Sequence, residues 1–169
     1  LVGLPWFANC QFEFPASKWA DSVFTQMDYD QRIGQLFMVA AYSNKDTSHL
    51  SHLDSLVEKY KIGGLIFFQG GPKRQISMTR KLQSKATIPL FIGFDGEWGL
   101  QMRLDSTMYF PRQMTLGAIQ SKESIEKMGE MIAKHCSILG IHINFAPDID
   151  VNNNPNNPVI GVRSFGENK

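Results

Sequence analysis

The chain has 169 residues, of which 43% are hydrophobic and 20% are charged, with 17 basic and 16 acidic residues. This composition is typical of a globular domain and excludes an intrinsically disordered chain. The basic residues are scattered, which argues against nucleic acid or an anionic membrane surface as a partner and favours a small neutral or weakly charged ligand. The longest apolar run, residues 36–42, is far shorter than the roughly 20 residues of a membrane-spanning helix, so no membrane span is expected.

The N-terminal region differs in character from the rest of the chain. The first 15 residues mix aromatic residues, prolines and a cysteine without periodicity, so residues 1–27 are expected to form an N-terminal arm and residues 28–169 a folded domain. Cys10 and Cys136 have no metal-type spacing and no pattern that predicts a disulfide. No metal site and no cofactor are expected.

A short helix is predicted over residues 28–35, before the first of four apolar runs. Each run is short and bounded by Gly, Pro or Asn, which predicts strands buried on both faces over residues 36–41, 64–68, 90–94 and 141–145. Between them, apolar residues recur at helical spacing. This predicts helices over residues 50–60, with cap candidates at 46–48, over 76–82, and over 125–139, where Gly140 ends the helix.

The alternation of strands and helices is typical of βαβ units and a parallel sheet with right-handed crossovers. Four strands do not close a barrel, and an eight-stranded parallel barrel takes about 250 residues. Two architectures fit: an open doubly wound sheet, or the first half of a TIM-type (β/α)8 barrel.

Acidic residues, arginines and a tryptophan follow the third and fourth predicted strands, at the strand ends where ligands bind in parallel α/β folds. Asp95, Glu97, Trp98 and Arg103 come after the third, and Arg163 follows the fourth after an Asn-rich segment. Carboxylates and arginines bind the hydroxyls of sugars, and an aromatic ring packs on the C–H face. Asp95, Arg103 and Arg163 are therefore candidate sugar-binding residues, although such residues also serve as caps and salt-bridge partners.

Several other residues have structural interpretations that we favour. Asp148 and Asp150 are read as acceptors that order the Asn-rich turn rather than as a paired carboxylate site. His49 and His52 have a spacing compatible with metal binding, but no third ligand is near and both are expected to face solvent. The Gly70–Gly71–Pro72 segment lacks the residues of a phosphate-binding loop and predicts a tight turn into a helix.

From about Ile33 onward the sequence resembles the N-terminal barrel domain of glycoside hydrolase family 3. The resemblance rests on the segments IGQLFMV, KIGGLIFF, FDGEWGLQMR, FPRQMTLGA, GIHINFAPDIDVN and NPVIGVRSFGEN, in the family's order and spacing. The GGLIFF and RSFGEN segments look more like the bacterial β-N-acetylglucosaminidase branch than the two-domain β-glucosidases. The family's hydroxyl-binding aspartate and two arginines fall on Asp95, Arg103 and Arg163. At Trp98 the family has glycine more often.

The resemblance implies a retaining glycosidase that removes terminal β-linked N-acetylglucosamine from cell-wall or glycan fragments. The family's nucleophile and acid/base lie downstream, so no catalytic residue is assigned in this chain and the 169 residues alone are expected to be inactive. The implied partners are a carbohydrate substrate, the C-terminal half of the same barrel and a further β-lactamase-like domain. A periplasmic or secreted location is expected. The alternatives are a β-glucosidase or xylosidase of the same family and a non-catalytic sugar-binding α/β module.

Overall fold

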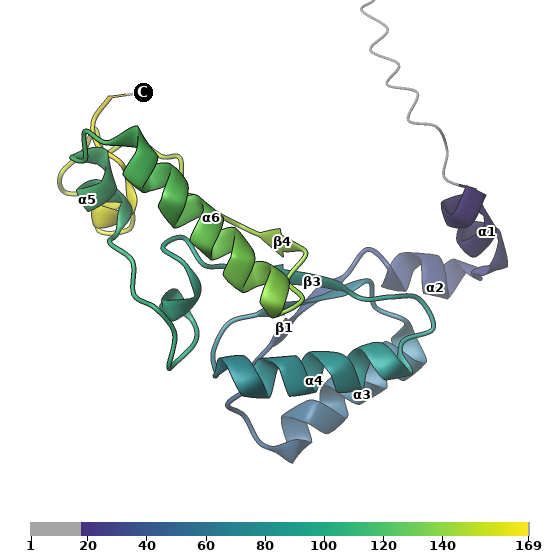
Figure 1. The fold of residues 1–169 in the computed structure, drawn as a ribbon. Helices are drawn as coiled ribbons and strands as arrows, with labels where there is room; N and C mark the ends of the chain where they lie inside the picture. The colour runs from purple at the N-terminus through teal and green to yellow at the C-terminus, as the bar shows by residue number, and fades with distance from the viewer. Residues whose placement is uncertain (1–17, 169) are drawn as a thin grey trace, which may run out of the picture.

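A computed structural model describes residues 18–168 of the chain. Cys10 and most of the expected N-terminal arm lie outside the described residues. Four strands form one parallel sheet in the order β1-β2-β3-β4, each paired with its neighbour in sequence. The strands are β1 (Met38–Ala41), β2 (Gly64–Phe67), β3 (Phe91–Phe94) and β4 (Ile143–Asn144). Each lies within one of the predicted apolar runs, which confirms the predicted parallel α/β architecture (Figure 1).

The helices connect the strands as predicted. The described helices are α1 (Lys18–Gln26), α2 (Tyr29–Gly34), α3 (Thr47–Tyr60), α4 (Pro72–Lys85), α5 (Gln113–Gly117) and α6 (Lys122–Ile138), with short 3₁₀ helices η1 (Leu100–Met102) and η2 (Gly161–Arg163). The sequence did not predict α1, which lies within the expected arm, nor α5, η1 and η2. These last three are too short to show a hydrophobic period.

The ends of the long helices have identifiable chemical causes. Asp46 caps α3, because its side chain accepts a hydrogen bond from the His49 amide at 3.2 Å. Pro72 occupies the start of α4, where a missing amide hydrogen costs nothing. After α6 the chain turns at Gly140, whose φ of 68° is the left-handed conformation that glycine adopts most readily. The cap at Asp46, the turn into α4 and the stop at Gly140 were all predicted.

The hydrophobic core lies on one face of the sheet. Leu65 and Phe67 of β2 and Ile92 and Phe94 of β3 point to this face and are fully buried. α3 and α4 lie side by side beneath them (Figure 1). Helices α3, α4 and α6 complete one continuous cluster by contributing the buried residues Leu53, Val57, Leu82 and Cys136. Burial in this apolar cluster raises the pKa of the Cys136 thiol.

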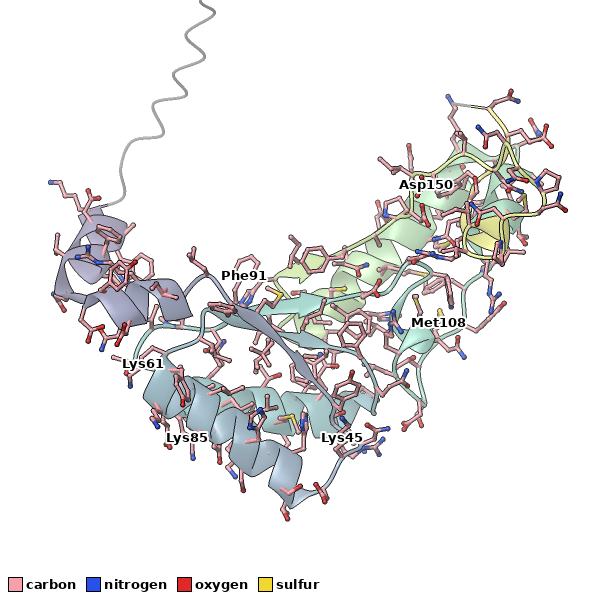
Figure 2. The ribbon with its side chains drawn as sticks, turned by 180° about the vertical axis from the view of Figure 1, so that it is seen from behind. Lys45, Lys61, Lys85, Phe91, Met108 and Asp150 are labelled. Atoms are coloured by element: carbon pink, nitrogen blue, oxygen red, sulfur yellow. The ribbon has the colours of Figure 1, made fainter. Side chains whose placement is uncertain are left out.

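The opposite face of the sheet is partly open, so the prediction of burial on both faces is wrong for this chain. Phe91, Ile143 and Phe145 are 49%, 36% and 49% exposed. Phe91 lies on the side away from α3 and α4 (Figure 2). Met38 and Phe145 meet over Gly93, where an added Cβ would lie 2.7 Å from the Met38 sulfur and 3.1 Å from the Phe145 ring. The apolar residues are in place, but no layer within residues 18–168 covers them.

Candidate functional site

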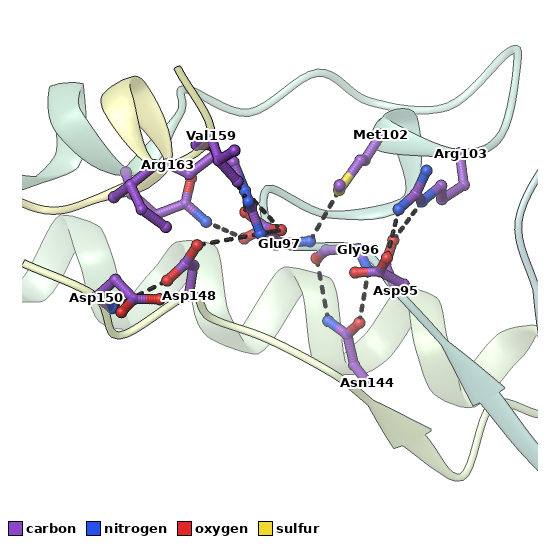
Figure 3. A network of polar contacts seen from close by, with 12 residues as sticks. Asp95, Gly96, Glu97, Met102, Arg103, Asn144, Asp148, Asp150, Val159 and Arg163 are labelled. Carbon is purple, nitrogen blue, oxygen red and sulfur yellow. Dashed lines mark hydrogen bonds and ion pairs between the residues drawn. The ribbon is translucent and has the colours of Figure 1, made fainter. Parts of the chain in front are cut away.

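Polar side chains gather at the carboxyl ends of β3 and β4 (Figure 3). Asp95 comes directly after β3, and Glu97 follows two residues later. Asp148 lies in the loop after β4, and Arg163 ends the 3₁₀ helix η2. Because parallel strands bring their carboxyl ends to one edge of the sheet, residues distant in sequence meet here. The result is two arginine–carboxylate groups that share one short peptide segment, residues 95–97.

The first group joins Asp95 and Arg103. Arg103 Nη2 forms an ion pair with Asp95 Oδ2, and Arg103 Nε donates to the backbone oxygen of Asp95 at 2.8 Å. The guanidinium carbon lies 5.0 Å from the centre of the Phe68 ring, at the end of β2. The side chains of Asp95 and Arg103 are 25% and 20% exposed. Three contacts therefore hold Arg103 in place, and the Asp95–Arg103 pair remains partly exposed to solvent.

The backbone on either side of Arg103 is also tied to the neighbouring loop. The Gly70 amide donates to the Arg103 carbonyl at 3.3 Å, and the Asp105 amide donates to the Gly70 carbonyl at 2.8 Å. These bonds link the loop after β3 to the loop after β2 in a short parallel bridge. The position of Arg103 is thus set by the loops that follow two neighbouring strands of the sheet.

The second group joins Glu97, Asp148 and Arg163. Arg163 Nε lies 3.0 Å from each carboxylate oxygen of Glu97, and Nη2 donates to Oε1 at 2.6 Å. Arg163 Nη2 also lies 3.0 Å from Asp148 Oδ2. The side chains of Glu97 and Asp148 are only 5% and 6% exposed, whereas that of Arg163 is 34% exposed. Hydrogen bonding to Glu97 raises the pKa of Arg163, and the charges of Glu97, Asp148 and Asp95 act in the same direction.

The segment that carries both carboxylates is held by polar side chains from β4 and α5. The Asn144 carboxamide binds Gly96 twice: its oxygen accepts from the Gly96 amide at 2.9 Å and its nitrogen donates to the Gly96 carbonyl at 3.2 Å. Gln113, which is fully buried, donates to the Glu97 carbonyl at 3.1 Å. Asp95 and Glu97 therefore project from a backbone whose position is fixed by neighbouring elements.

The loop after β4 is ordered by its own side chains, as predicted for Asp148 and the Asn-rich turn. Asp148 Oδ1 accepts from the Asp150 amide at 2.9 Å. The side-chain oxygens of Asn154 and Asn157 accept from the amides of Asn156 and Val159, at 3.1 and 2.9 Å. Asp148 combines this bond with its contact to Arg163. A hydrogen bond with Asp148 and its negative charge raise the pKa of Asp150, while Arg163 lowers it.

The segment after Arg163 is attached to the same loop. Ser164 is fully buried, and its hydroxyl lies 2.6 Å from the Asp150 carbonyl and accepts from the Gly166 amide at 3.2 Å. The Asn152 amide donates to the Gly166 carbonyl at 2.8 Å. Arg163 is therefore anchored through its backbone neighbours as well as through its side chain.

The three predicted site residues all lie at this edge of the sheet, but in two separate groups. Asp95 and Arg103 pair with each other, and Arg163 pairs with Glu97 and Asp148 instead. Sequence reasoning noted Glu97 only as a loop carboxylate and assigned no role to Asn144. The position of Asn144, polar at the carboxyl end of an apolar strand, was the available signal.

The surroundings of Trp98 and of His49 bear on two further interpretations of the sequence. The Arg112 guanidinium lies 4.8 Å from the centre of the Trp98 ring, so one side of the ring already has a cationic neighbour. The prediction that both His49 and His52 face solvent is wrong for His49. His49 Nε2 accepts a hydrogen bond from the Tyr42 amide at 3.1 Å, and partial burial lowers its pKa. This bond leaves His49 less suited to a metal, and residues 18–168 contain no group of three potential metal ligands.

This arrangement can hold a molecule with adjacent hydroxyl groups. Asp95 Oδ1 and Arg103 Nη1 have no hydrogen-bond partner among the described residues, so a carboxylate acceptor and a guanidinium donor remain side by side. No helix in the described part of the chain is long and apolar enough to cross a membrane. Fold and side chains together define a parallel α/β protein with a cluster of polar side chains at the carboxyl ends of its strands.

The chain belongs to glycosyl hydrolase family 3, because the sequence profile of the family's N-terminal domain matches residues 28–169. β-Hexosaminidase A of Pseudoalteromonas piscicida is 42% identical over 129 residues, which cover 69% of this chain and 22% of the relative. A β-N-acetylglucosaminidase/β-glucosidase of Cellulomonas fimi is 28% identical over 148 residues, covering 88% and 26%. The family resemblance inferred from the motifs is confirmed. The chain spans about a quarter of the length of these two relatives.

Solved structures of the family have the same fold. A β-glucoside phosphorylase BglX bound to 2FGlc superimposes with a TM-score of 0.80 at 25% identity, covering 89% of this chain and 27% of that one. Native NagZ from Neisseria gonorrhoeae gives a TM-score of 0.53 at 23% identity, covering 77% and 40%. The four strands and their helices correspond to the N-terminal half of the family's barrel. Of the two predicted architectures, the half-barrel is confirmed.

Proposed function

We propose that this chain supplies sugar-binding residues of a retaining glycosidase that removes terminal β-linked N-acetylglucosamine from cell-wall or glycan fragments. The observation that carries the proposal is the partly exposed Asp95–Arg103 pair at the carboxyl end of β3. Family membership and the name of the 42% identical relative, a β-hexosaminidase, support the reaction class and the sugar.

In this proposal, Asp95 Oδ1 accepts a hydrogen bond from one sugar hydroxyl and Arg103 Nη1 donates to its neighbour. Arg163 Nη1, which lies 3.3 Å from the Val159 carbonyl, keeps one further hydrogen to donate. Hydrogen bonds to charged groups are stronger than neutral ones, so three such groups orient a small neutral sugar effectively. No cofactor takes part.

Neither carboxylate of the 95–97 segment is suited to attack the anomeric carbon. Both oxygens of Glu97 are bonded to Arg163 and its side chain is 5% exposed, while Asp95 is paired with Arg103. A retaining mechanism needs a free carboxylate nucleophile and a separate acid/base group. We therefore place both catalytic groups outside this chain, in the C-terminal half of the barrel and its loops, and expect the 169 residues alone to be inactive. The longer relatives are consistent with a further domain, and we propose a periplasmic or secreted location.

A second candidate, β-glucosidase activity, is favoured by a specific observation. The relative from Cellulomonas fimi carries both activities in its name, and BglX is described as a β-glucoside phosphorylase. Asp95 and Arg103 bind hydroxyls in either case, so they do not distinguish the substituent at C2 of the sugar. A xylosidase or a non-catalytic sugar-binding module would use the same contacts.

The test is turnover by the product of the full reading frame on an aryl β-N-acetylglucosaminide, an aryl β-glucoside and an aryl β-xyloside. We expect the highest kcat/KM on the N-acetylglucosaminide. Higher kcat/KM on the glucoside would establish the second candidate. Saturable sugar binding without turnover of any of the three would identify a binding module.

A further inference from the structure

The tripeptide 95–97 places two carboxylates on two different arginines. Asp95 pairs with Arg103, eight residues along the chain, and Glu97 pairs with Arg163, 66 residues along. Between them, both backbone groups of Gly96 are bonded to Asn144. The spacing of one residue lets a single fixed peptide segment set the direction of both side chains, which are drawn apart in Figure 3.

We infer that Glu97, together with Asp148, is a positioning residue that orients Arg163 toward the sugar; this inference rests on the proposed function. Glu97 itself has no free oxygen for a ligand, because Arg163 Nε and Nη2 occupy both of them. Asp148 uses Oδ2 for Arg163 and Oδ1 for the Asp150 amide. Both buried carboxylates therefore reach a bound sugar only through the arginine, and Asp148 in addition orders its own loop.

The geometry of the guanidinium explains why two carboxylates are needed. Arg163 donates from the Nε and Nη2 side to Glu97 in a side-on arrangement, which fixes the plane of the group. The contact of Nη2 with Asp148 and of Nη1 with the Val159 carbonyl fixes its rotation within that plane. What remains is one Nη1 hydrogen in a side chain that is 34% exposed, above carboxylates that are almost fully buried.

The electrostatics of the group show that its parts depend on one another. A buried carboxylate is costly unless it is paired, so Glu97 requires Arg163 as much as Arg163 requires Glu97. Removing Arg163 alone leaves both Glu97 and Asp148 charged and without their cationic partner inside the protein. Changing both Glu97 and Arg163 to glutamine leaves only Asp148, of the two carboxylates, charged and without the arginine, which is a smaller disturbance.

The experiment is a double-mutant cycle of Glu97→Gln and Arg163→Gln in the product of the full reading frame, with kcat, KM and Tm measured for each protein. We expect Glu97→Gln to raise KM about tenfold with kcat within about twofold, the effect of losing one charged hydrogen bond in binding. In the Arg163→Gln background, Glu97→Gln should alter kcat/KM less than about twofold, because Glu97 affects sugar binding only by orienting Arg163, which is absent there. Tm should be higher for the double variant than for Arg163→Gln alone.

The control is Glu123→Gln, which breaks the exposed ion pair with Lys127 on α6, away from the proposed site. Its kinetic constants should match those of the wild type. If Glu97 serves stability alone, the folded fraction of Glu97→Gln should have the KM of the wild type, and this result would overturn the inference. The inference is also overturned if the losses in kcat/KM of Glu97→Gln and Arg163→Gln multiply in the double variant. A wild type that turns over none of the aryl glycosides overturns the proposed function and the inference with it. An active wild type with multiplying losses overturns the inference alone.

Discussion

Replacement of Asp95 by asparagine tests the proposed sugar contact with little change of shape. Asp95→Asn keeps the side-chain size but removes the negative charge from the one oxygen that is free, Oδ1. Arg103 stays anchored, since its Nε donates to the backbone oxygen of residue 95 at 2.8 Å and its guanidinium lies over the Phe68 ring. The variant therefore isolates the carboxylate contact from the position of the arginine.

The expected magnitude follows from the contact that is lost. A hydrogen bond to a charged group contributes about 1.5–3 kcal/mol, which corresponds to roughly 10- to 150-fold in kcat/KM. The Asp95–Arg103 pair is 20–25% exposed, so its loss should lower stability by only about 1 kcal/mol, or about 2–4 °C in Tm. Binding should thus change far more than folding.

The assay is kcat/KM on the aryl β-N-acetylglucosaminide, with the product of the full reading frame. Glu123→Gln is the control, because it removes a carboxylate from an ion pair whose side chains are 68% and 75% exposed. It should stay within about twofold of the wild type. A fall of less than about threefold for Asp95→Asn, or an equal fall for both variants, would refute the role assigned to Asp95.

Three further predictions concern the fold and its charges. Asp148 raises the pKa of Asp150, so ionisation of Asp150 destabilises the folded protein above the folded-state pKa, and this destabilisation is absent below the unfolded-state pKa. Asp150→Asn should therefore raise Tm at pH 7 but not near pH 3. An equal gain in Tm at both pH values would contradict this. Leu82→Ala, at a fully buried site, should lower the free energy of unfolding by about 2–5 kcal/mol in urea titrations, whereas Leu36→Ala, at an 83% exposed site, should change it by less than about 0.5 kcal/mol. The partly open face around Phe91 and Phe145 and the unpaired strand edges should make the 169-residue chain associate as its concentration rises in light scattering; a monomer at every concentration would count against this.

The strands and long helices could be predicted because their signals are local. Each apolar run between Gly, Pro or Asn residues is a strand, and the cap at Asp46 and the stop at Gly140 mark helix ends. Burial of both faces could not be predicted reliably, because the sequence of a strand shows that a face is apolar and not whether another layer covers it. Phe91 and Phe145 are the examples.

The candidate site was predictable in its location and less so in its connections. Asp95 and Arg103 are eight residues apart in one loop after a strand, and both were predicted as candidate site residues, but the ion pair between them was not predicted. The pairing of Glu97 with Arg163 joins positions 66 residues apart, and nothing local in either segment specifies it. The hydrogen bonds between Asn144 and Gly96 depend likewise on the parallel register of β3 and β4.

We propose that this half-barrel carries sugar-binding residues while the catalytic groups lie elsewhere. The most direct test is a parallel assay of the 169-residue chain and of the product of its full reading frame on the aryl β-N-acetylglucosaminide. We expect turnover by the longer product alone, reduced by Asp95→Asn. Turnover by the 169-residue chain itself, abolished by Asp95→Ala, would contradict it.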